Sequence, residues 1–357
     1  MTAGLRVLVV NAGSSSLKVD LVQDGRAVTS YDGLPDRPPE VDAVGHRIVH
    51  GGPDLVDPVV LDAAVEQQLR DLVELAPLHQ PKSLDGLAAA QELLPDVPHV
   101  ACFDTAFHTT LPAAASTFAL PQEWRKRWGV RRYGFHGLSH SWASSRAGQL
   151  VPGARRVITC HLGAGASLAA VLDGRSVDTT MGFTPLAGLV MATRSGSIDP
   201  GLLLWLEEHE GLRPAEVADA LEHASGLLAL AGTADMRQIL TRSDERARLA
   251  LDVYLHSLAT HVAGMTVALG GLDTLVFTGG VGERAPAIRS GAAERLAHLG
   301  VAVDPDRNDA VRSIDGDNPD ADITGADSRV RTLVVRARED LQIAAGVVQA
   351  LGHRART

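Results

Sequence analysis

The sequence predicts an α/β protein that contains a duplicated domain. Two similar units of strand, Gly/Ser-rich turn and strand begin at Arg6 and Arg156. Segments with apolar residues spaced three and four apart, as in amphipathic helices, fill the chain between and after these units. The length of 357 residues also favours two domains, because single cores stop growing at roughly 250–300 residues.

The first unit opens the chain. Residues 6–10 form a short β-branched run, residues 11–16 (Asn-Ala-Gly-Ser-Ser-Ser) form a small-residue turn, and residues 17–22 alternate between apolar and polar side chains. This alternation is typical of a half-buried strand, so we expect a hairpin-like pair of strands here.

The second unit repeats this order and extends it. We expect a strand at 157–161, a turn at 162–167 (Leu-Gly-Ala-Gly-Ala-Ser) and a strand at 168–172. Asp173-Gly174 is typical of a tight hairpin turn and leads into a third strand at 176–180.

The remaining segments are predicted from periodicity and flanking residues. The expected helices cover residues 61–75, 83–94, 248–269 and 340–351. Two further strands are expected at 99–103 and 274–277, each followed by a polar loop. Helices that alternate with strands indicate mixed sheets with helices packed around them.

Composition excludes several classes of protein. There are 33 basic and 43 acidic residues, for a net charge of −10, whereas a general nucleic-acid binder needs a basic face. Cys102 and Cys160 lie inside apolar runs, which predicts two reduced core thiols. We find no targeting segment and no apolar run near transmembrane length. We therefore expect a cytoplasmic protein with neither nucleic-acid nor membrane partners.

Two common phosphate-binding architectures are absent from the sequence. A P-loop ends in Gly-Lys-Ser/Thr, but none of the three lysines (Lys18, Lys82 and Lys126) follows a glycine. The protein-kinase motifs His-Arg-Asp and Asp-Phe-Gly do not occur either.

A dinucleotide-binding fingerprint is a real alternative. A strand at 274–277 precedes Gly280-Val-Gly282-Glu-Arg-Ala285, and Asp304 follows a short strand at a suitable distance. A dehydrogenase would bind NAD tightly, but little chain remains after Asp304 to complete its nucleotide domain. A glycine loop that opens a helix is also a general phosphate or adenine site.

Five segments combine charged or imidazole side chains with glycines or other small residues. They are residues 45–52 (GHRIVHGG), 103–108 (FDTAFH), 131–140 (RRYGFHGLSH), 193–200 (TRSGSIDP) and 336–340 (RARED). Each segment alone has a plain structural explanation, such as a surface ion pair for Arg47 or a helix cap for Asp104. Arginines beside small residues also suggest clamps for anions, and five such segments in one chain indicate a functional site.

The sequence resembles the acetate kinase family, within the superfamily of sugar kinases, actin and heat-shock chaperone ATPases. The matching stretches run from Val7 to Ala344 and are NAGSSSLK, GHRIVHGG, FDTAFH, RRYGFHG, DTTMGFTPL, TRSG-x-IDP and TGGVGE. The resemblance implies two ribonuclease H-like domains with the active site in the cleft between them. It places the first domain at 1–109 plus 340–357 and the second, with the nucleotide site and a homodimer interface, at 110–339.

The resemblance also implies the chemistry, which is reversible phosphoryl transfer from ATP to acetate by direct in-line attack. Arg47 and Arg194 would flank the transferring group, His136 would donate a hydrogen bond to it, and His79 would support the site. Asp104 would act with a divalent ion, which would be Mg²⁺ with Mn²⁺ as an alternative, and Asn11 and Glu339 would hold that ion.

Two binding regions follow from the same resemblance. The apolar pocket for the acyl methyl group would comprise Arg47, Val49, Leu78, Phe135 and Pro185. The residues that would contact ATP or ADP are Asn11, Ser14, Lys18, His161, Gly163, Gly165, Asp235, Arg237, Gly280 and Val281.

The chain departs from the family pattern at several positions. Ala164, Ala187, Ser197 and Arg284 replace the more usual residues, Glu339-Asp340 replaces Glu-Glu, and the stretch before Arg47 is shortened. These changes concern the nucleotide loops and the surroundings of Arg194. The alternatives left open are a propionate kinase, a butyrate kinase with poorer motif matches, and a non-catalytic ATP-binding module.

Overall fold

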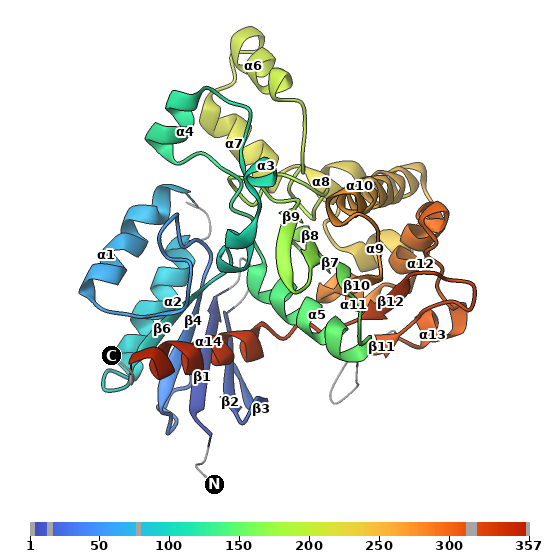
Figure 1. Cartoon of the computed structure of the whole chain (residues 1–357). Coiled ribbons are helices and arrows are strands. Elements are labelled where there is room, and N and C mark those ends of the chain that lie inside the picture. The colour runs from blue at the N-terminus through green and yellow to red at the C-terminus, as the bar shows by residue number, and fades with distance from the viewer. Residues whose placement is uncertain (1–3, 13–16, 76–79, 312–319, 355–357) are drawn as a thin grey trace. The chain divides into compact units, whose positions relative to one another are not determined.

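The computed structural model describes residues 4–12, 17–75, 80–311 and 320–354 (Figure 1). The chain divides into two compact units. Unit 1 comprises Met1–Thr109, Phe135–Trp142 and Arg338–Thr357, and unit 2 comprises Thr110–Gly134 and Ala143–Ala337. This division differs from the domain boundaries predicted from sequence mainly at residues 135–142, which pack with unit 1.

Unit 1 is built on a six-stranded mixed sheet with the order β3-β2-β1-β4-β6-β5. Its strands are β1 (Arg6–Ala12), β2 (Leu17–Gln23), β3 (Arg26–Asp32), β4 (Ala43–Ile48), β5 (Val59–Val60) and β6 (His99–Phe103). β1, β2 and β3 are antiparallel neighbours, whereas β1, β4 and β6 are parallel. The strands predicted at 6–10, 17–22 and 99–103 are therefore confirmed.

Helices cover both faces of this sheet. Side chains alternate along β1, so that Val7 and Val9 pack against α14 (Glu339–Arg354), and Leu8 and Val10 pack on the side of α2 (Gln80–Leu93). In Figure 1 the red helix α14 crosses the strands of this sheet. Gly45 allows this close packing, because a Cβ there would lie 2.7 Å from a methyl carbon of Ile343.

Unit 2 repeats the same topology. Its sheet has the order β11-β12-β10-β7-β8-β9, with β7 (Arg156–Leu162), β8 (Ala166–Leu172), β9 (Arg175–Thr179), β10 (Thr274–Thr278), β11 (Ala321–Asp322) and β12 (Arg331–Val334). Read from β9, each strand has the same neighbours and directions as its counterpart in unit 1. Even the register shifts agree, at Leu21/Val22 in β2 and Ala170/Val171 in β8. The duplication predicted from two short motifs thus extends over both sheets.

This topology excludes the dinucleotide-binding alternative. A doubly wound nucleotide domain needs mostly parallel strands, but β7, β8 and β9 are antiparallel neighbours. The prediction of a strand before Asp304 is also wrong. Val303 forms only an isolated bridge with Thr324, and Asp304 instead caps a helix by accepting a hydrogen bond from the Arg307 backbone N–H.

The described part of the chain contains further helices. They are α1 (Ala63–Asp71), α3 (Ala113–Ser116), α4 (Gln122–Trp128), α5 (Gly137–Leu150), α6 (Pro200–His209), α7 (Pro214–His223), α8 (Gly226–Ala231), α9 (Met236–Leu240), α10 (Glu245–Leu269), α11 (Gly279–Arg284), α12 (Pro286–Arg295) and α13 (Pro305–Ala310), with 3₁₀ turns at Leu72–Leu75, Ala106–Thr110 and Ala297–Leu299. The helix predicted at 61–75 is therefore shorter and ends in a 3₁₀ turn. The helices predicted at 83–94, 248–269 and 340–351 are confirmed as α2, α10 and α14 within a few residues.

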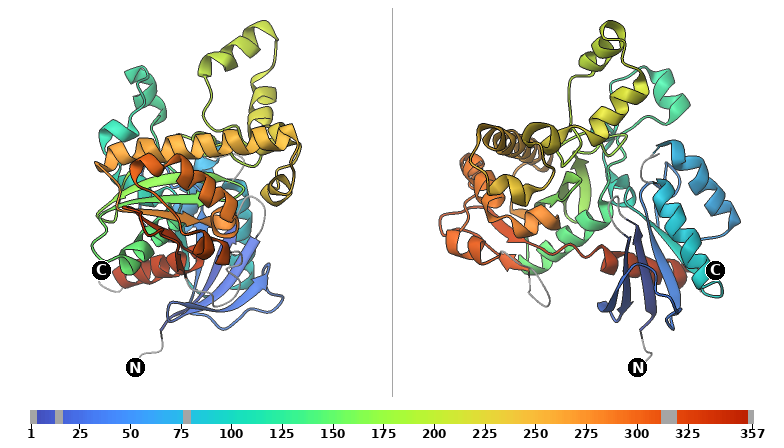
Figure 2. Two further views of the ribbon diagram at one scale, coloured as in Figure 1. Left: turned by 90° about the vertical axis from the view of Figure 1, so that its right-hand side faces the viewer. Right: turned by 180° about the vertical axis from the view of Figure 1, so that it is seen from behind.

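Helix α10 is the main cover of the second sheet (Figure 2). Asp244 caps its first turn by accepting from the Ala247 N–H, and Gly270 ends it with a φ of 66°. Its buried face includes Tyr254, Leu258 and Val262. Both cysteines are free and buried, as predicted. None of the helices in the described part of the chain is both long and apolar enough to cross a membrane.

Candidate functional site

The most connected polar group of unit 1 lies at the carboxyl ends of β4 and β6. Arg47 is near the end of β4, and Asp104 directly follows β6. Because these two strands are parallel and adjacent, the two side chains meet although they are far apart in sequence. Arg47 Nε lies 3.1 Å from both carboxylate oxygens of Asp104, and Nη2 lies 2.5 Å from Oδ2. Only 12% of the Arg47 side chain and 1% of the Asp104 side chain are exposed.

The same network reaches the first strand and the last helix. Arg47 Nη1 donates to Asn11 Oδ1 at 3.3 Å, and Asn11 Nδ2 donates to Glu339 Oε2 at 2.7 Å. Asn11 lies in β1, and Glu339 is the first residue of α14. Four of the predicted site residues therefore form one continuous chain of hydrogen bonds.

Burial and charge act against each other in this network. Burial would lower the pKa of Arg47, but the carboxylates of Asp104 and Glu339 more than offset it and raise that pKa. Burial raises the pKa of Asp104, which Arg47 opposes and the nearby Glu339 carboxylate reinforces. The Arg47 guanidinium is thus held as a cation, with Nε and Nη2 engaged by Asp104 and Nη1 by Asn11.

The backbone of His136 is anchored to Asp104. The Asp104 carboxylate accepts a hydrogen bond from the His136 backbone N–H, and the Asp104 carbonyl accepts from the Gly137 N–H at 2.8 Å. His136 has a φ of 56°, a left-handed conformation that is uncommon for a residue with a side chain. A Cβ at Gly137 would lie 2.1 Å from the Asp104 carbonyl oxygen, so only glycine fits there. The structure thus brings the backbone of the predicted His136 next to Asp104, the partner of Arg47.

The predicted acyl-pocket residues fall into separate groups. Val49 and Phe135 are both buried in unit 1. The Phe135 ring contacts the His50 ring edge-on at 5.6 Å between centroids, and its carbonyl lies 3.0 Å from His108 Nε2. Pro185 is buried in unit 2. Three other predicted residues, Ser14, Leu78 and His79, lie outside the described residues.

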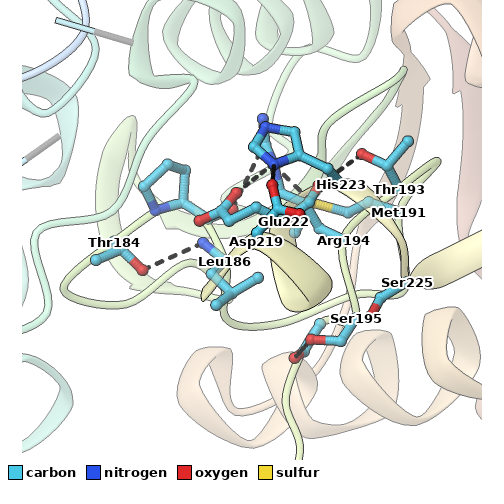
Figure 3. A network of polar contacts seen from close by, with 12 residues as sticks. Thr184, Leu186, Met191, Thr193, Arg194, Ser195, Asp219, Glu222, His223 and Ser225 are labelled. Carbon is cyan, nitrogen blue, oxygen red and sulfur yellow. Dashed lines mark hydrogen bonds and ion pairs between the residues drawn. The ribbon is translucent and has the colours of Figure 1, made fainter. Parts of the chain in front are cut away.

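Arg194 is the centre of a second buried network, in unit 2 (Figure 3). Its Nη1 donates to the Pro185 carbonyl at 3.1 Å, and its Nε lies 3.3 Å from Glu222 Oε2. Burial lowers the pKa of Arg194, while Glu222 opposes that shift. Glu222 was missed from the sequence, because it sits in the ordinary amphipathic pattern of α7 and carries no motif.

The loop that carries Arg194 is folded tightly on itself. The Ser197 hydroxyl accepts from the Gly188 N–H at 2.9 Å, and the Ser197 N–H donates back to the Gly188 carbonyl at 3.0 Å. At Gly196 (φ 72°) a Cβ would lie 2.5 Å from the Leu189 carbonyl oxygen. Ser197, one of the positions that depart from the expected pattern, therefore supplies a side-chain acceptor in this loop.

The residues predicted to contact nucleotide in unit 2 lie mostly at the carboxyl ends of β7 and β10. The Gly163 N–H donates to the Gly165 carbonyl at 3.0 Å, and His161 lies near the end of β7. Gly280 and Val281 lie in α11, directly after β10. A Cβ at Gly279 would lie 2.8 Å from the Leu162 carbonyl oxygen, so the two turns touch.

Three other predicted nucleotide contacts are more exposed. Asp235 caps α9, and it accepts from the backbone N–H of Arg237 at 2.9 Å and from its guanidinium at 2.8 Å. The Arg237 side chain is 91% exposed. Lys18 is exposed on β2. Their role in nucleotide binding therefore stays a prediction.

No group of three or more His, Cys, Asp or Glu side chains in the described ranges could hold a metal ion alone. Glu339, Asn11 and Asp104 do offer oxygen ligands, the kind that hard divalent cations take together with waters and substrate phosphates. Glu339 is only partly buried, so it would remain accessible to such an ion.

Comparisons with known proteins find one family over most of the chain. A model of the Acetokinase family matches residues 31–345. An acetate kinase from Trichormus variabilis is 47% identical over 313 residues, which are 85% of this chain and 75% of that protein. An acetate kinase from Leifsonia xyli is 48% identical over 318 residues, which are 87% of this chain and 79% of that protein.

Solved structures are similar over almost the whole chain. A propionate kinase from Francisella tularensis has a TM-score of 0.87 at 33% identity, with 96% of this chain and 98% of that chain covered. An acetate kinase from Porphyromonas gingivalis has a TM-score of 0.85 at 34% identity, with 97% and 100% covered. The family model begins at residue 31, after the strand that carries Asn11.

Proposed function

The chain belongs to the acetate kinase family, and from this premise we propose that it transfers the γ-phosphoryl group of ATP to acetate, reversibly, to form acetyl phosphate and ADP. The observation that carries the proposal is the hydrogen-bonded chain of Asn11, Arg47, Asp104 and Glu339, within a sequence that matches the family over residues 31–345.

The proposed mechanism needs no general base. A carboxylate is already nucleophilic at neutral pH, and an oxygen lone pair attacks the γ-phosphorus as the bond to the ADP oxygen breaks. The remaining task is to bring two anions together and to stabilise charge on the in-line transition state. Arg47, Arg194 and His136 are proposed to supply the cationic and hydrogen-bonding groups for this, and Asp104 fixes the guanidinium of Arg47.

A divalent ion, which we propose to be Mg²⁺ with Mn²⁺ as a substitute, would neutralise phosphate charge when bound. Glu339 and Asn11 would hold it. Nucleotide binding is assigned to the glycine turns of unit 2, with Gly163, Gly165, Gly280 and Val281 at the backbone and His161, Asp235 and Arg237 as side chains. A homodimer and a cytoplasmic location remain predictions from the resemblance and from the sequence.

Acetate and propionate differ by one methylene, which is worth about 1–3 kcal/mol in an apolar pocket. The similarity to a propionate kinase structure keeps propionate as the second candidate. The deciding assay measures ADP release with ATP, Mg²⁺ and acetate, propionate or butyrate, and traps the acyl phosphate with hydroxylamine. Acetate-dependent acyl phosphate with the highest kcat/KM supports the proposal. Folded protein that binds ATP but makes no acyl phosphate contradicts it.

Replacing Arg194 by alanine is expected to lower kcat by about 10³-fold or more, as for arginines that stabilise phosphoryl transfer elsewhere. The change also leaves the Glu222 carboxylate without its buried partner, which costs stability. The double variant Arg194→Ala/Glu222→Gln removes that charge and so separates the two effects. We expect it to regain thermal stability but not turnover, and recovered turnover would assign Arg194 a structural role only.

Replacing Glu339 by alanine is expected to raise the Mg²⁺ concentration for half-maximal activity by about 10–100-fold. The neighbouring Asp340→Asn is the matched control, because Asp340 is engaged with Arg338 at 2.7 Å and asparagine can still accept that hydrogen bond. Metal titrations of activity on both variants make the comparison. An equal shift in the two variants would point to a general disturbance at the start of α14.

A further inference from the structure

The first residue of helix α11, Gly279, has a left-handed backbone conformation. Gly279 has a φ of 78°, and the position of its missing Cβ lies against the Leu162 carbonyl at the end of β7. Thr278, which precedes it as the N-cap residue, makes no side-chain capping hydrogen bond. Because the first N–H groups of a helix have no partners within it, the start of α11 needs an acceptor from elsewhere.

Glu283 supplies that acceptor from within the helix itself. One carboxylate oxygen, Oε1, accepts from the Gly279 N–H at 3.0 Å and from the Ala337 N–H at 2.8 Å. Glu283 is only 6% exposed. Burial raises the pKa of Glu283. The hydrogen bonds from the two backbone N–H groups and the charges of Arg284 and Arg336 oppose that shift. A single buried oxygen therefore joins two segments that are 58 residues apart, from 279 to 337.

The other end of α11 is also fixed. Arg289 is fully buried, and its Nη1 donates to the carbonyls of Gly282 and Glu283 at 2.8 and 2.9 Å. Its Nη2 reaches the Asn308 carbonyl at 2.8 Å. Arg289 therefore binds the carbonyls at the end of α11, and the Glu283 carboxylate binds the N–H group at its start together with the Ala337 N–H.

Ala337 is the last residue of unit 2, and Glu339 follows two positions later. Three successive N–H groups fix the segment leading up to it. Val335 donates to the Phe277 carbonyl at 2.9 Å, Arg336 donates to Asp320 Oδ1 at 3.0 Å, and Ala337 donates to Glu283. Of these three acceptors, Glu283 is the one that also accepts from the Gly279 N–H.

We propose that Glu283 is a positioning residue that links the α11 turn to the Ala337–Glu339 segment, so that nucleotide binding at Gly280 and Val281 is coupled to metal binding by Glu339. This inference rests on the proposed function for the identity of the two ligands. The coupling is reciprocal. If bound metal raises the affinity for the nucleotide by some factor, bound nucleotide raises the affinity for the metal by the same factor.

The test compares Glu283→Ala, Glu283→Gln and Asp320→Ala in the full chain. Calorimetric titration with ADP, with and without Mg²⁺, gives the nucleotide Kd, and thermal unfolding reports on folding. Glu283→Ala leaves the buried Gly279 N–H and the partly buried Ala337 N–H without this acceptor, so we expect the ADP Kd to rise about tenfold and the Mg²⁺-dependent gain in ADP affinity to shrink. Glu283→Gln retains a carbonyl acceptor and should stay within about threefold of the unmodified protein.

Asp320→Ala is the matched control, because Asp320 holds the same segment one residue earlier without touching α11. It should leave the ADP Kd without Mg²⁺ unchanged. If Glu283→Ala does not fold, Glu283→Asp replaces it, since its shorter side chain cannot span both N–H groups. Unchanged ADP binding and Mg²⁺ gain in Glu283→Ala, or equal losses in Asp320→Ala, would overturn the inference.

The proposed function fails by a different signature. If the unmodified chain makes no acyl phosphate but the ADP and Mg²⁺ titrations still differ between Glu283→Ala and Asp320→Ala as expected, the coupling stands and the reaction assignment does not. If the unmodified chain is active and the titrations do not differ, the reaction stands and the coupling does not.

Discussion

Arg47→Ala is expected to lower kcat/KM for acyl phosphate formation by about 10³–10⁵-fold, the range seen for single arginines in phosphoryl transfer. The physical reason is that Arg47 combines a buried position with a fixed orientation. Its Nε and Nη2 are engaged by Asp104 and its Nη1 points to Asn11, so no reorganisation is needed when charge develops in the transition state. Initial-rate assays with acetate and Mg²⁺-ATP measure the effect.

Two further variants separate chemistry from folding. Arg47→Lys keeps the positive charge but not the planar fork that contacts both Asp104 oxygens, so we expect it to recover only a small part of the lost rate. Arg155→Ala is the control, because Arg155 forms a similar bidentate pair with Asp173 at 2.6 and 2.7 Å, but 70% of its side chain is exposed. Near-normal turnover of folded Arg47→Ala would refute the assignment.

The second large effect is a loss of stability in mild acid. Burial lowers the pKa of His46 to about 3 and the pKa of both His50 and His108 to about 4. In the unfolded chain these side chains take up protons below about pH 6.5, but in the folded chain they do not. The free energy of unfolding therefore falls as the pH falls below that value, and it continues to fall until the folded pKa values are reached.

The size of this effect follows from the pH interval. Between pH 6.5 and 5, each of the three histidines contributes a loss of about 2 kcal/mol. Together the three amount to about 6 kcal/mol, which is comparable to the lower end of the stability of an ordinary domain, about 5–15 kcal/mol. Urea unfolding at several pH values measures the slope, and we expect stability to be fully present above pH 6.5.

The slope also gives a test that does not depend on the absolute stability of each variant. His46→Gln should reduce the slope between pH 6 and 5 by about one proton. It removes the ring that stacks on His99 with Nε2 2.8 Å from its Nδ1. Equal slopes for the unmodified protein and His46→Gln would contradict the prediction.

Local features of the fold could be predicted from the sequence because they depend on neighbouring residues. The strand pairs on either side of residues 11–16 and 162–167 follow from period-two alternation around small-residue turns, and both are present. The end of α10 at Leu269 follows from its apolar periodicity, whereas its start at Glu245 lies three residues before the predicted one. The match of whole sheets, down to the register shift at Leu21/Val22 and Ala170/Val171, could not be predicted, because strand register depends on packing between distant segments.

The candidate site divides in the same way. The sequence singled out the segments that carry Arg47, Asp104, His136 and Glu339, and the resemblance gave their roles and added Asn11. It gave no sign of Glu222, and it offered TGGVGE as a nucleotide motif without a task for Glu283. These two carboxylates act through partners elsewhere in the chain, Arg194 and Ala337, and a single sequence does not record such pairings.

By itself, the sequence determined the α/β class, the two strand–turn–strand units and the residue types available for phosphoryl transfer. Only the tertiary structure decided which of them meet. Asn11 and Glu339 are 328 positions apart yet lie 2.7 Å from one another, because β1 and the start of α14 come together in one unit. Short-range patterns follow from backbone and side-chain preferences, whereas such contacts exist only after distant strands have paired and buried their apolar faces.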